Sequence, residues 1–171
     1  MSKYDELRKA FSAKQDAERE FMRDNEAFAH KLVFGLRDYL DAPKSFSERD
    51  GDTTYSRNYV AFYEREQYGD KWKRVDHHLD AIEHLNDGTF SFRFGLALER
   101  AEGSYPKHFF VFDAKCKRRG NTVEVVIDDK HRIACHKIDD SWPDIHNAYE
   151  LIFNRLMEAL QKRPGADQGQ P

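Results

Sequence analysis

The chain contains few cysteines and glycines and no long apolar run, and these shortages exclude several classes of protein. Its two cysteines, Cys116 and Cys135, fit a reducing compartment rather than a disulfide-stapled secreted scaffold. With 9 glycines in 171 residues, the chain has no G-x-x-x-x-G-K loop to cradle a phosphate. No segment approaches the ~18 apolar residues of a membrane span, and residues 1–6 lack signal-peptide character. We therefore expect a cytoplasmic protein without a membrane partner.

Motifs for metal ligation and for nucleophilic catalysis are missing as well. The 8 histidines and the cysteines show no C-x-x-C or H-E-x-x-H spacing. There is no G-x-S-x-G elbow, and Cys135 and His136 are neighbours whose side chains point to opposite faces of a strand. Because these motifs are absent, the sequence gives no reason to assign a catalytic residue, a cofactor or a metal.

Charged and aromatic side chains are abundant. Charged residues make up 35% of the chain and hydrophobic residues 39%, while 13 Phe, 8 Tyr and 2 Trp supply large apolar areas for burial. A chain of this length can bury roughly two-thirds of its unfolded surface, so one domain can fold without a metal or disulfide. The net charge of −3 argues against wholesale electrostatic binding of nucleic acid.

Hydrophobic periodicity predicts an α+β fold. We expect a single domain over residues 1–163, with an N-terminal helix or helix pair, an antiparallel meander of about five strands, and a closing C-terminal helix. The sheet should occupy most of residues 58–138. Residues 164–171 are expected to form a disordered tail.

The first 41 residues are predicted to form a helical arm. Apolar side chains keep helical spacing over residues 3–41, and Ser2 with Asp5 is typical of a capping box. An unbroken helix of this length would span roughly 58 Å, about twice the diameter of a small domain. Its first half must therefore project, pair with another chain as a homodimer, or fold back. A break at Asp24-Asn25 that gives two ordinary helices is the alternative.

Two segments, one before the predicted sheet and one after its first strand, have less regular patterns. Residues 42–57 are expected to be a long polar loop with a turn at Asp50-Gly51-Asp52, and disorder is the default for such a loop. Residues 71–86 are predicted to be helical because their large apolar residues follow a 3-4-3 spacing. These residues are Trp72, Val75, Leu79 and Ile82.

The sheet is predicted from alternating apolar residues and turn signals. Strands are expected over residues 58–66, 90–98, 107–118, 122–128 and 131–138. Gly120-Asn121 is a credible two-residue hairpin turn, which would place Asp113 opposite Asp128 and Lys117 opposite Glu124. In that register the two cysteines lie roughly 9–10 Å apart, too far for a disulfide, and are expected to be core residues.

The C-terminal helix is predicted over residues 141–163. Ser141 and Asp144 supply a capping signal at its start. Its apolar stripe has an unbroken 3-4-3-4-3 spacing. The stripe consists of Trp142, Ile145, Tyr149, Ile152, Leu156 and Ala159.

The tripeptide Asp113-Ala114-Lys115 resembles the D/E-x-K motif of metal-dependent nucleases. In that motif the acid holds Mg²⁺ or Mn²⁺ and the lysine steadies the attacking water or the developing charge. This alternative assigns Asp87, Asp113, Lys115 and Asp128 to catalysis, with Asp87 and Asp113 as metal ligands. However, the motif is short, and the nuclease folds place a helix where two further strands are expected here. We therefore prefer an exposed sheet face with alternating charges.

A cluster of cations at the predicted hairpin tip suggests a second alternative. Lys115, Lys117, Arg118 and Arg119, with Arg132 nearby, have the charge to contact phosphates, as a nucleic-acid-binding regulator would require. No aromatic residues interleave with them to stack on bases, and the net charge of the chain is negative.

The favoured hypothesis is therefore a non-catalytic protein–protein interaction module of the regulator, inhibitor, immunity or chaperone type. It would act through its helices, its sheet face or the polar loop. The long N-terminal helix favours this hypothesis because it exceeds what a monomeric core can use. A protein partner is expected, with homodimerisation through that helix as one form of it.

Overall fold

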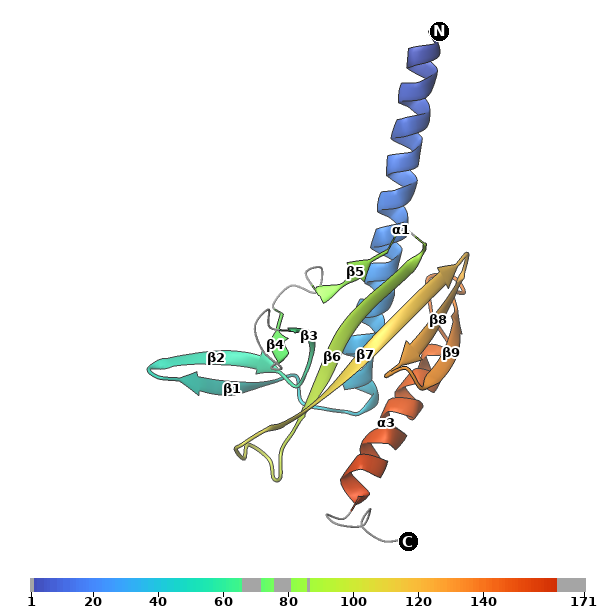
Figure 1. Ribbon diagram of the computed structural model, residues 1–171. Helices are drawn as coiled ribbons and strands as arrows, with labels where there is room; N and C mark the ends of the chain where they lie inside the picture. Colours follow the sequence, from blue (N-terminus) through green and yellow to red (C-terminus); the bar gives the residue numbers. More distant parts are fainter. Residues whose placement is uncertain (1, 66–71, 76–80, 86, 163–171) are drawn as a thin grey trace, which may run out of the picture.

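The computed structural model has the α+β architecture that the sequence predicts, and it describes residues 2–65, 72–75, 81–85 and 87–162. A long N-terminal helix precedes an antiparallel sheet, and a second helix closes the chain (Figure 1). The elements are α1 (Lys3–Tyr39), β1 (Ser45–Asp50), β2 (Thr53–Asn58), β3 (Val60–Arg65), β4 (Trp72–Arg74), β5 (Glu83–His84), β6 (Thr89–Leu98), β7 (His108–Arg119), β8 (Thr122–Ile127), β9 (His131–His136) and α3 (Ile145–Gln161).

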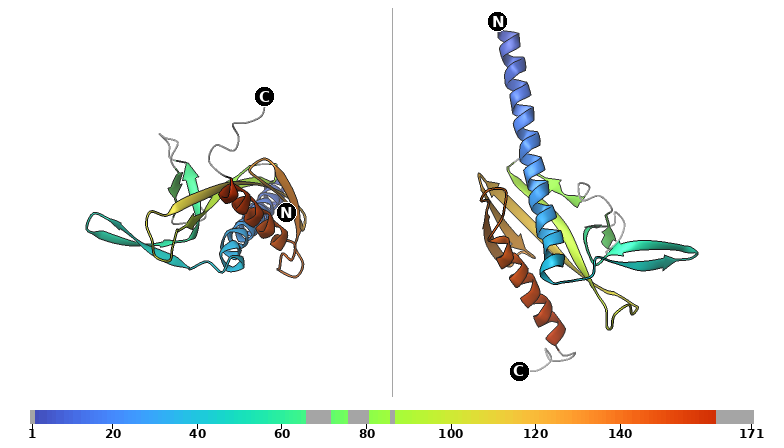
Figure 2. Two further views of the ribbon diagram at one scale, coloured as in Figure 1. Left: turned by 90° about the horizontal axis from the view of Figure 1, so that it is seen from below. Right: turned by 180° about the vertical axis from the view of Figure 1, so that it is seen from behind.

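The main sheet has seven strands rather than about five. Its order is β4-β3-β6-β7-β8-β9, and β5 pairs with β6 beside this path. All of its recorded strand pairs are antiparallel, and the register of β7 on β8 confirms the Gly120-Asn121 turn, because Lys117 lies opposite Glu124. Both helices lie across the same face of the sheet, as the view from behind shows (Figure 2).

The core forms between this helix-covered face and the two helices. Side chains at every second position of β6 are buried there, and β8 contributes in the same alternating way. From the helices, Phe28 and Leu32 of α1 and Ile152 of α3 are fully buried in the same cluster. Phe28 also meets the ring of Trp142 edge-on, with ring centroids 4.7 Å apart.

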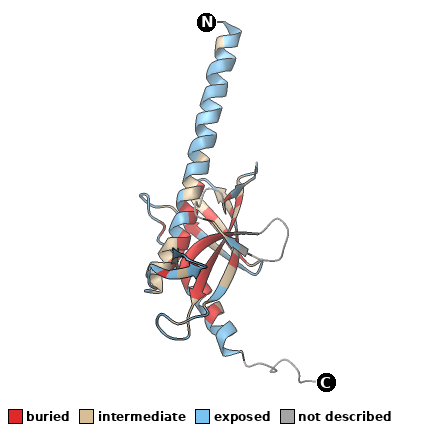
Figure 3. Ribbon diagram, turned by 90° about the vertical axis from the view of Figure 1, so that its left-hand side faces the viewer, coloured by how far each residue is buried: buried red, intermediate tan, exposed pale blue. Residues whose placement is uncertain are grey.

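Helix α1 is one continuous helix, so the alternative of a break at Asp24-Asn25 is wrong. The predicted capping box is confirmed, because the Ser2 side chain accepts from the Asp5 backbone and the Asp5 side chain accepts from the Ser2 backbone. Thirty-seven residues correspond to roughly 55 Å of helix. Only the C-terminal half packs into the body, and the first half stands in solvent (Figure 3).

Residues 42–57 are not a long loop, because most of them form the β1–β2 hairpin. Asp50 pairs with Thr53, and Gly51 closes the turn with a φ of +59°, a conformation that glycine adopts at little cost. The hairpin projects from the body (Figure 1). Because it is polar on both faces apart from Phe46 and Tyr55, it lacks the alternating apolar pattern from which a strand is predicted.

The helix predicted over residues 71–86 is wrong in part. Trp72–Arg74 and Glu83–His84 are short strands, β4 and β5, on the flank of the main sheet. Of the residues whose 3-4-3 spacing suggested a helix, Trp72 begins β4, whereas Val75 and Ile82 lie just outside the two strands. Residues 71, 76–80 and 86, which the prediction also covered, lie outside the described residues.

The apolar stripe of α3 is confirmed, but its predicted cap is wrong. Ile145, Tyr149 and Leu156 are buried as expected. The Asp144 carboxylate does not cap the helix and instead accepts from the backbone N–H of His136 and contacts that residue's ring Nδ1 at 2.6 Å. The Asp144 carboxylate therefore bonds to His136 of β9 rather than to a backbone N–H in the first turn of α3.

Close packing of α3 on α1 depends on Gly35. The Tyr149 hydroxyl donates to the backbone carbonyl of Lys31 at 2.8 Å, and a Cβ at Gly35 would collide with that hydroxyl.

No helix within the described ranges is both long and apolar enough to cross a membrane.

We expect Phe92→Ala and Leu156→Ala each to lower the free energy of unfolding by roughly 2–5 kcal/mol, because each change leaves a cavity in the packed core. Urea denaturation measures the effect. Phe11→Ala is the matched control, since the Phe11 side chain is exposed. Wild-type stability of either core variant would contradict this assignment of the core.

We expect both thiols to resist modification in the folded chain. Cys116 and Cys135 are free and buried, and burial raises the pKa of Cys135 to about 12, so little reactive thiolate is present near neutral pH. A chromogenic thiol reagent should therefore react with neither cysteine until denaturant is added. Rapid labelling of the native chain would show that the core opens at β7 or β9.

Candidate protein-interaction surface

The first half of α1 carries a stripe of exposed apolar side chains. Residues 3–20, here called the arm, are exposed apart from the half-buried Asp5. Tyr4, Leu7 and Phe11 are 72%, 69% and 61% exposed, and Met22 at the base of the arm is 42% exposed. At 3.6 residues per turn these four fall within one sector of roughly 60°. We call them the arm stripe.

Local interactions hold the arm helical without help from the body. The capping box closes its first turn, and three ion pairs between residues three or four positions apart follow along the arm. Lys14 and Glu18 form one such pair at 3.6 Å and interrupt the arm stripe between Phe11 and Met22. Exposed pairs of this kind each contribute only about 0.3–0.5 kcal/mol. The arm is therefore a helix with little packing energy of its own.

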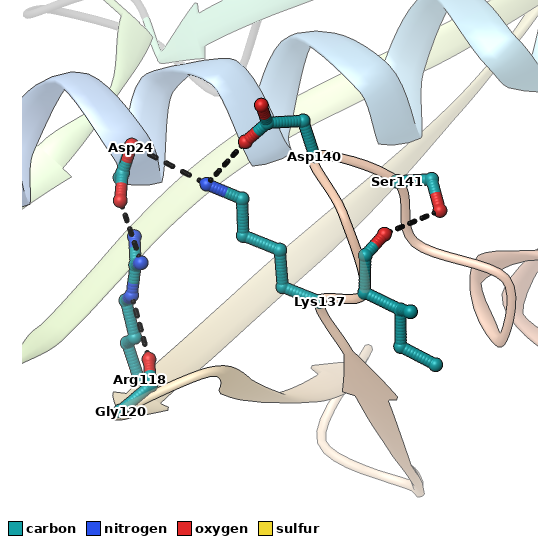
Figure 4. A network of polar contacts seen from close by, with 7 residues as sticks. Asp24, Arg118, Gly120, Lys137, Asp140 and Ser141 are labelled. Carbon is teal, nitrogen blue, oxygen red and sulfur yellow. Dashed lines mark hydrogen bonds and ion pairs between the residues drawn. The ribbon is translucent and has the colours of Figure 1, made fainter.

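A cluster of charges fixes the direction in which the arm leaves the body. Asp24 accepts from the Arg118 guanidinium at 2.7 Å and lies 3.9 Å from the Lys137 ammonium (Figure 4). Lys137 also pairs with Asp140 at 3.1 Å, and Arg118 donates to the Gly120 carbonyl. We call Asp24, Arg118, Lys137 and Asp140 the clamp. It joins α1 to the β7–β8 turn and to the segment that follows β9.

Arg118 is central to the clamp because it is nearly buried. Its side chain is 8% exposed, and its guanidinium lies 5.7 Å from the centre of the Phe21 ring. Charge-assisted hydrogen bonds in such partly desolvated surroundings are stronger than those in water. The clamp thus holds the helix at the point where its burial ends.

The cations predicted to bind nucleic acid are mostly paired within the molecule. Lys115 contacts Asp129 at 2.7 Å, and Lys117 contacts Asp87 at 3.5 Å. Arg118 belongs to the clamp, and Arg132 pairs with Glu124 at 3.4 Å. Of the predicted tip, Arg119 is the one cation for which the described residues supply no ion-pair partner.

The residues of the D-x-K hypothesis do not converge. Asp87 lies beside Lys117, whereas Asp113 lies four residues further along β7, which corresponds to roughly 13 Å. Asp113 pairs with Arg93 at 2.6 Å instead. Within the ranges that the structure describes, no group of three or more His, Cys, Asp or Glu side chains is placed to hold a metal.

Asp113 and Asp128 are neighbours, but they do not face each other as uncompensated charges. The Asp128 carboxylate accepts from the Asp113 backbone N–H at 2.8 Å and pairs with Arg155 of α3 at 2.8 Å. Asp128 has a φ of +49°, so it turns the chain at the end of β8 rather than extending the strand. Each carboxylate therefore has its own arginine, which relieves the repulsion between the two acids.

A partly buried ion pair lies at the end of β6. The Glu99 carboxylate contacts the Lys107 ammonium and accepts from the Tyr59 hydroxyl at 2.8 Å. The hydrogen bond from Lys107 is the main cause that lowers the pKa of Glu99. These three residues tie the β6–β7 connection to the residue that precedes β3. Their spacing along the chain gives no signal of the contact.

A second apolar surface lies next to this pair. The groove has a volume of about 350 Å³ and is bounded by α3, the segment after α1 and the end of β6. Phe153, Met157 and Leu160 of α3 line it and remain partly exposed. These residues lie on the side of α3 next to its buried stripe. The apolar periodicity of the sequence does not tell this exposed side from the buried one.

Comparisons of the chain with protein-family models, with curated proteins and with solved structures found no match.

Removing the charge of Asp24 from the clamp should destabilise the folded body. We expect Asp24→Asn to lower the free energy of unfolding by about 1–3 kcal/mol, because Arg118 would lose a charged partner in a nearly buried site. Asp16→Asn, in the exposed arm, is the matched control and should change stability by less than ~0.5 kcal/mol. Equal stabilities of the two variants would show that the clamp does not anchor α1.

Proposed function

We propose that this chain is a non-catalytic protein–protein interaction module whose binding surface is the arm stripe. The observation that carries the proposal is the position of Tyr4, Leu7, Phe11 and Met22. These large apolar side chains are held in water on a helix that the body does not cover. Contiguous exposed apolar side chains on one face are characteristic of interaction sites.

The pattern of the arm stripe matches a known way in which helices recognise proteins. Tyr4, Leu7 and Phe11 stand at positions i, i+3 and i+7, the spacing with which an amphipathic helix places anchors against an apolar surface. Aromatic residues are also enriched among the anchors that dominate binding energy. A partner that buries this face would supply the packing that the arm lacks.

The alternatives lose support from the same structure. A metal-dependent nuclease would need Asp87 and Asp113 to meet, and ion pairs with Lys117 and Arg93 hold them apart. A nucleic-acid-binding regulator would need free cations at the β7–β8 tip, where most of them are neutralised by neighbouring carboxylates. Regulator, inhibitor, immunity and chaperone roles are all compatible with binding through the arm.

The proposal predicts that binding depends on one face of the arm. Tagged chain, incubated with lysate of its native host under nuclease treatment, should retain a stoichiometric protein. Phe11→Asp should reduce retention at least tenfold, because it places a charge in the apolar interface. Ala13→Asp is the matched control, since Ala13 is exposed on the opposite face of the same helix.

The two variants introduce the same side chain into the same helix, so a general loss of helicity would affect both. Circular dichroism checks that the body remains folded in each. Equal retention by Phe11→Asp and Ala13→Asp would contradict a role for the arm stripe. Recovery of nothing but nucleic acid from untreated lysate would favour the phosphate-binding alternative instead.

A further inference from the structure

We propose that the partner of the arm is the arm of a second copy of this chain, paired in antiparallel orientation. The inference rests on the proposed function and deepens it by naming the partner. Three features of the arm carry it: its division into halves of opposite charge, the position of the charges that interrupt the arm stripe, and a register that joins one apolar pair and one pair of opposite charges.

The arm and its base divide into halves of opposite charge. Residues 3–14 contain four basic and two acidic side chains, for a net charge of +2. Residues 15–24 contain two basic and four acidic side chains, for a net charge of −2. Antiparallel pairing places each basic half beside an acidic half, whereas parallel pairing places like charges together. The charge pattern therefore selects the antiparallel orientation.

The charges within the arm stripe strengthen this argument. In a symmetric parallel pair each residue faces its own copy, so Lys14 would face Lys14 and Glu18 would face Glu18 at the interface. Like charges that face each other across a helix pair are unfavourable and are used by proteins to reject a pairing. Antiparallel pairing removes both contacts.

One antiparallel register joins apolar and charged groups at the same time. Placing Tyr4 against Met22 of the second copy brings Phe11 opposite Gln15, whose methylene groups can cover the ring. The same register brings Arg8 opposite Glu18 of the second copy. Since the pair is symmetric, each of these contacts occurs twice.

The dimensions of the arm set the expected affinity. The 18 residues of the arm span roughly 27 Å, so the two bodies would lie at opposite ends of the paired helices. Two helices of this length bury an area near the lower end of the range for specific complexes. We therefore expect a reversible dimer with a dissociation constant on the order of 1–100 µM.

Sedimentation equilibrium of the full chain from about 1 to 500 µM tests the pairing. Wild type should pass from monomer to dimer, and Arg8→Glu or Glu18→Arg should each weaken the dimer about tenfold or more. The double variant, which exchanges the two charges, should restore the wild-type constant. A double variant that is weaker than either single variant would overturn the proposed register.

A distance measurement tests the orientation. Because both native cysteines are buried, a spin label attached to Lys3→Cys marks the end of the arm alone. The antiparallel pair separates the two labels by about 30 Å or more, whereas a parallel pair brings them within about 20 Å. Labels found at the shorter distance would overturn the antiparallel assignment.

Failure of this inference can be told apart from failure of the proposed function. If wild type stays monomeric up to 500 µM, the arm does not pair with itself at the expected affinity and the inference is overturned. Loss of a different retained protein in Phe11→Asp, but not in Ala13→Asp, would still support the arm as a binding surface. If neither self-association nor retention depends on Phe11, both proposals fall.

Discussion

The structure depends on the burial of one half of a single rigid helix. Phe28, Leu32 and Leu36 fix the C-terminal half of α1 against the sheet and against the neighbouring helix α3. Since an α-helix of this length does not bend sharply without a proline or an equivalent defect, the path of the buried half dictates the path of the exposed half. The clamp around Asp24 reinforces that direction at the point where the core ends. The arm and its apolar stripe are thus consequences of how the body is packed.

Elements with a buried face could be predicted from sequence, and those without one could not. The phenylalanines of β6 alternate with polar or small residues, and α3 has a continuous apolar stripe, so both elements were predicted with the correct type. The β1–β2 hairpin is exposed on both faces, and its only apolar anchor in a buried cluster is Phe46. The turn at Gly51 was visible, but nothing in the flanking residues indicated strands.

The partners of charged residues were the least predictable part. The hairpin register correctly placed Asp113 near Asp128, yet the arginines that neutralise them, Arg93 and Arg155, come from β6 and α3. The same limit applies to Asp24. Aspartate followed by asparagine disfavours a helix locally, which suggested a break, but Arg118 from β7 stabilises the carboxylate in place. Tertiary contacts between residues far apart in sequence overrode the local preference in each case.

Hydrogen exchange along α1 shows whether the arm is unpacked in the single chain and covered by a second copy; it is followed by mass spectrometry at concentrations well below and well above the dissociation constant. In dilute solution we expect fast exchange in residues 3–20 and strong protection around Phe28, Leu32 and Leu36, because only the latter half is packed. At high concentration the arm should become protected as it pairs. Protection of the arm that is equally strong at every dilution would mean that it packs on its own body. Fast exchange of the arm at every concentration would mean that it has no partner in a second copy.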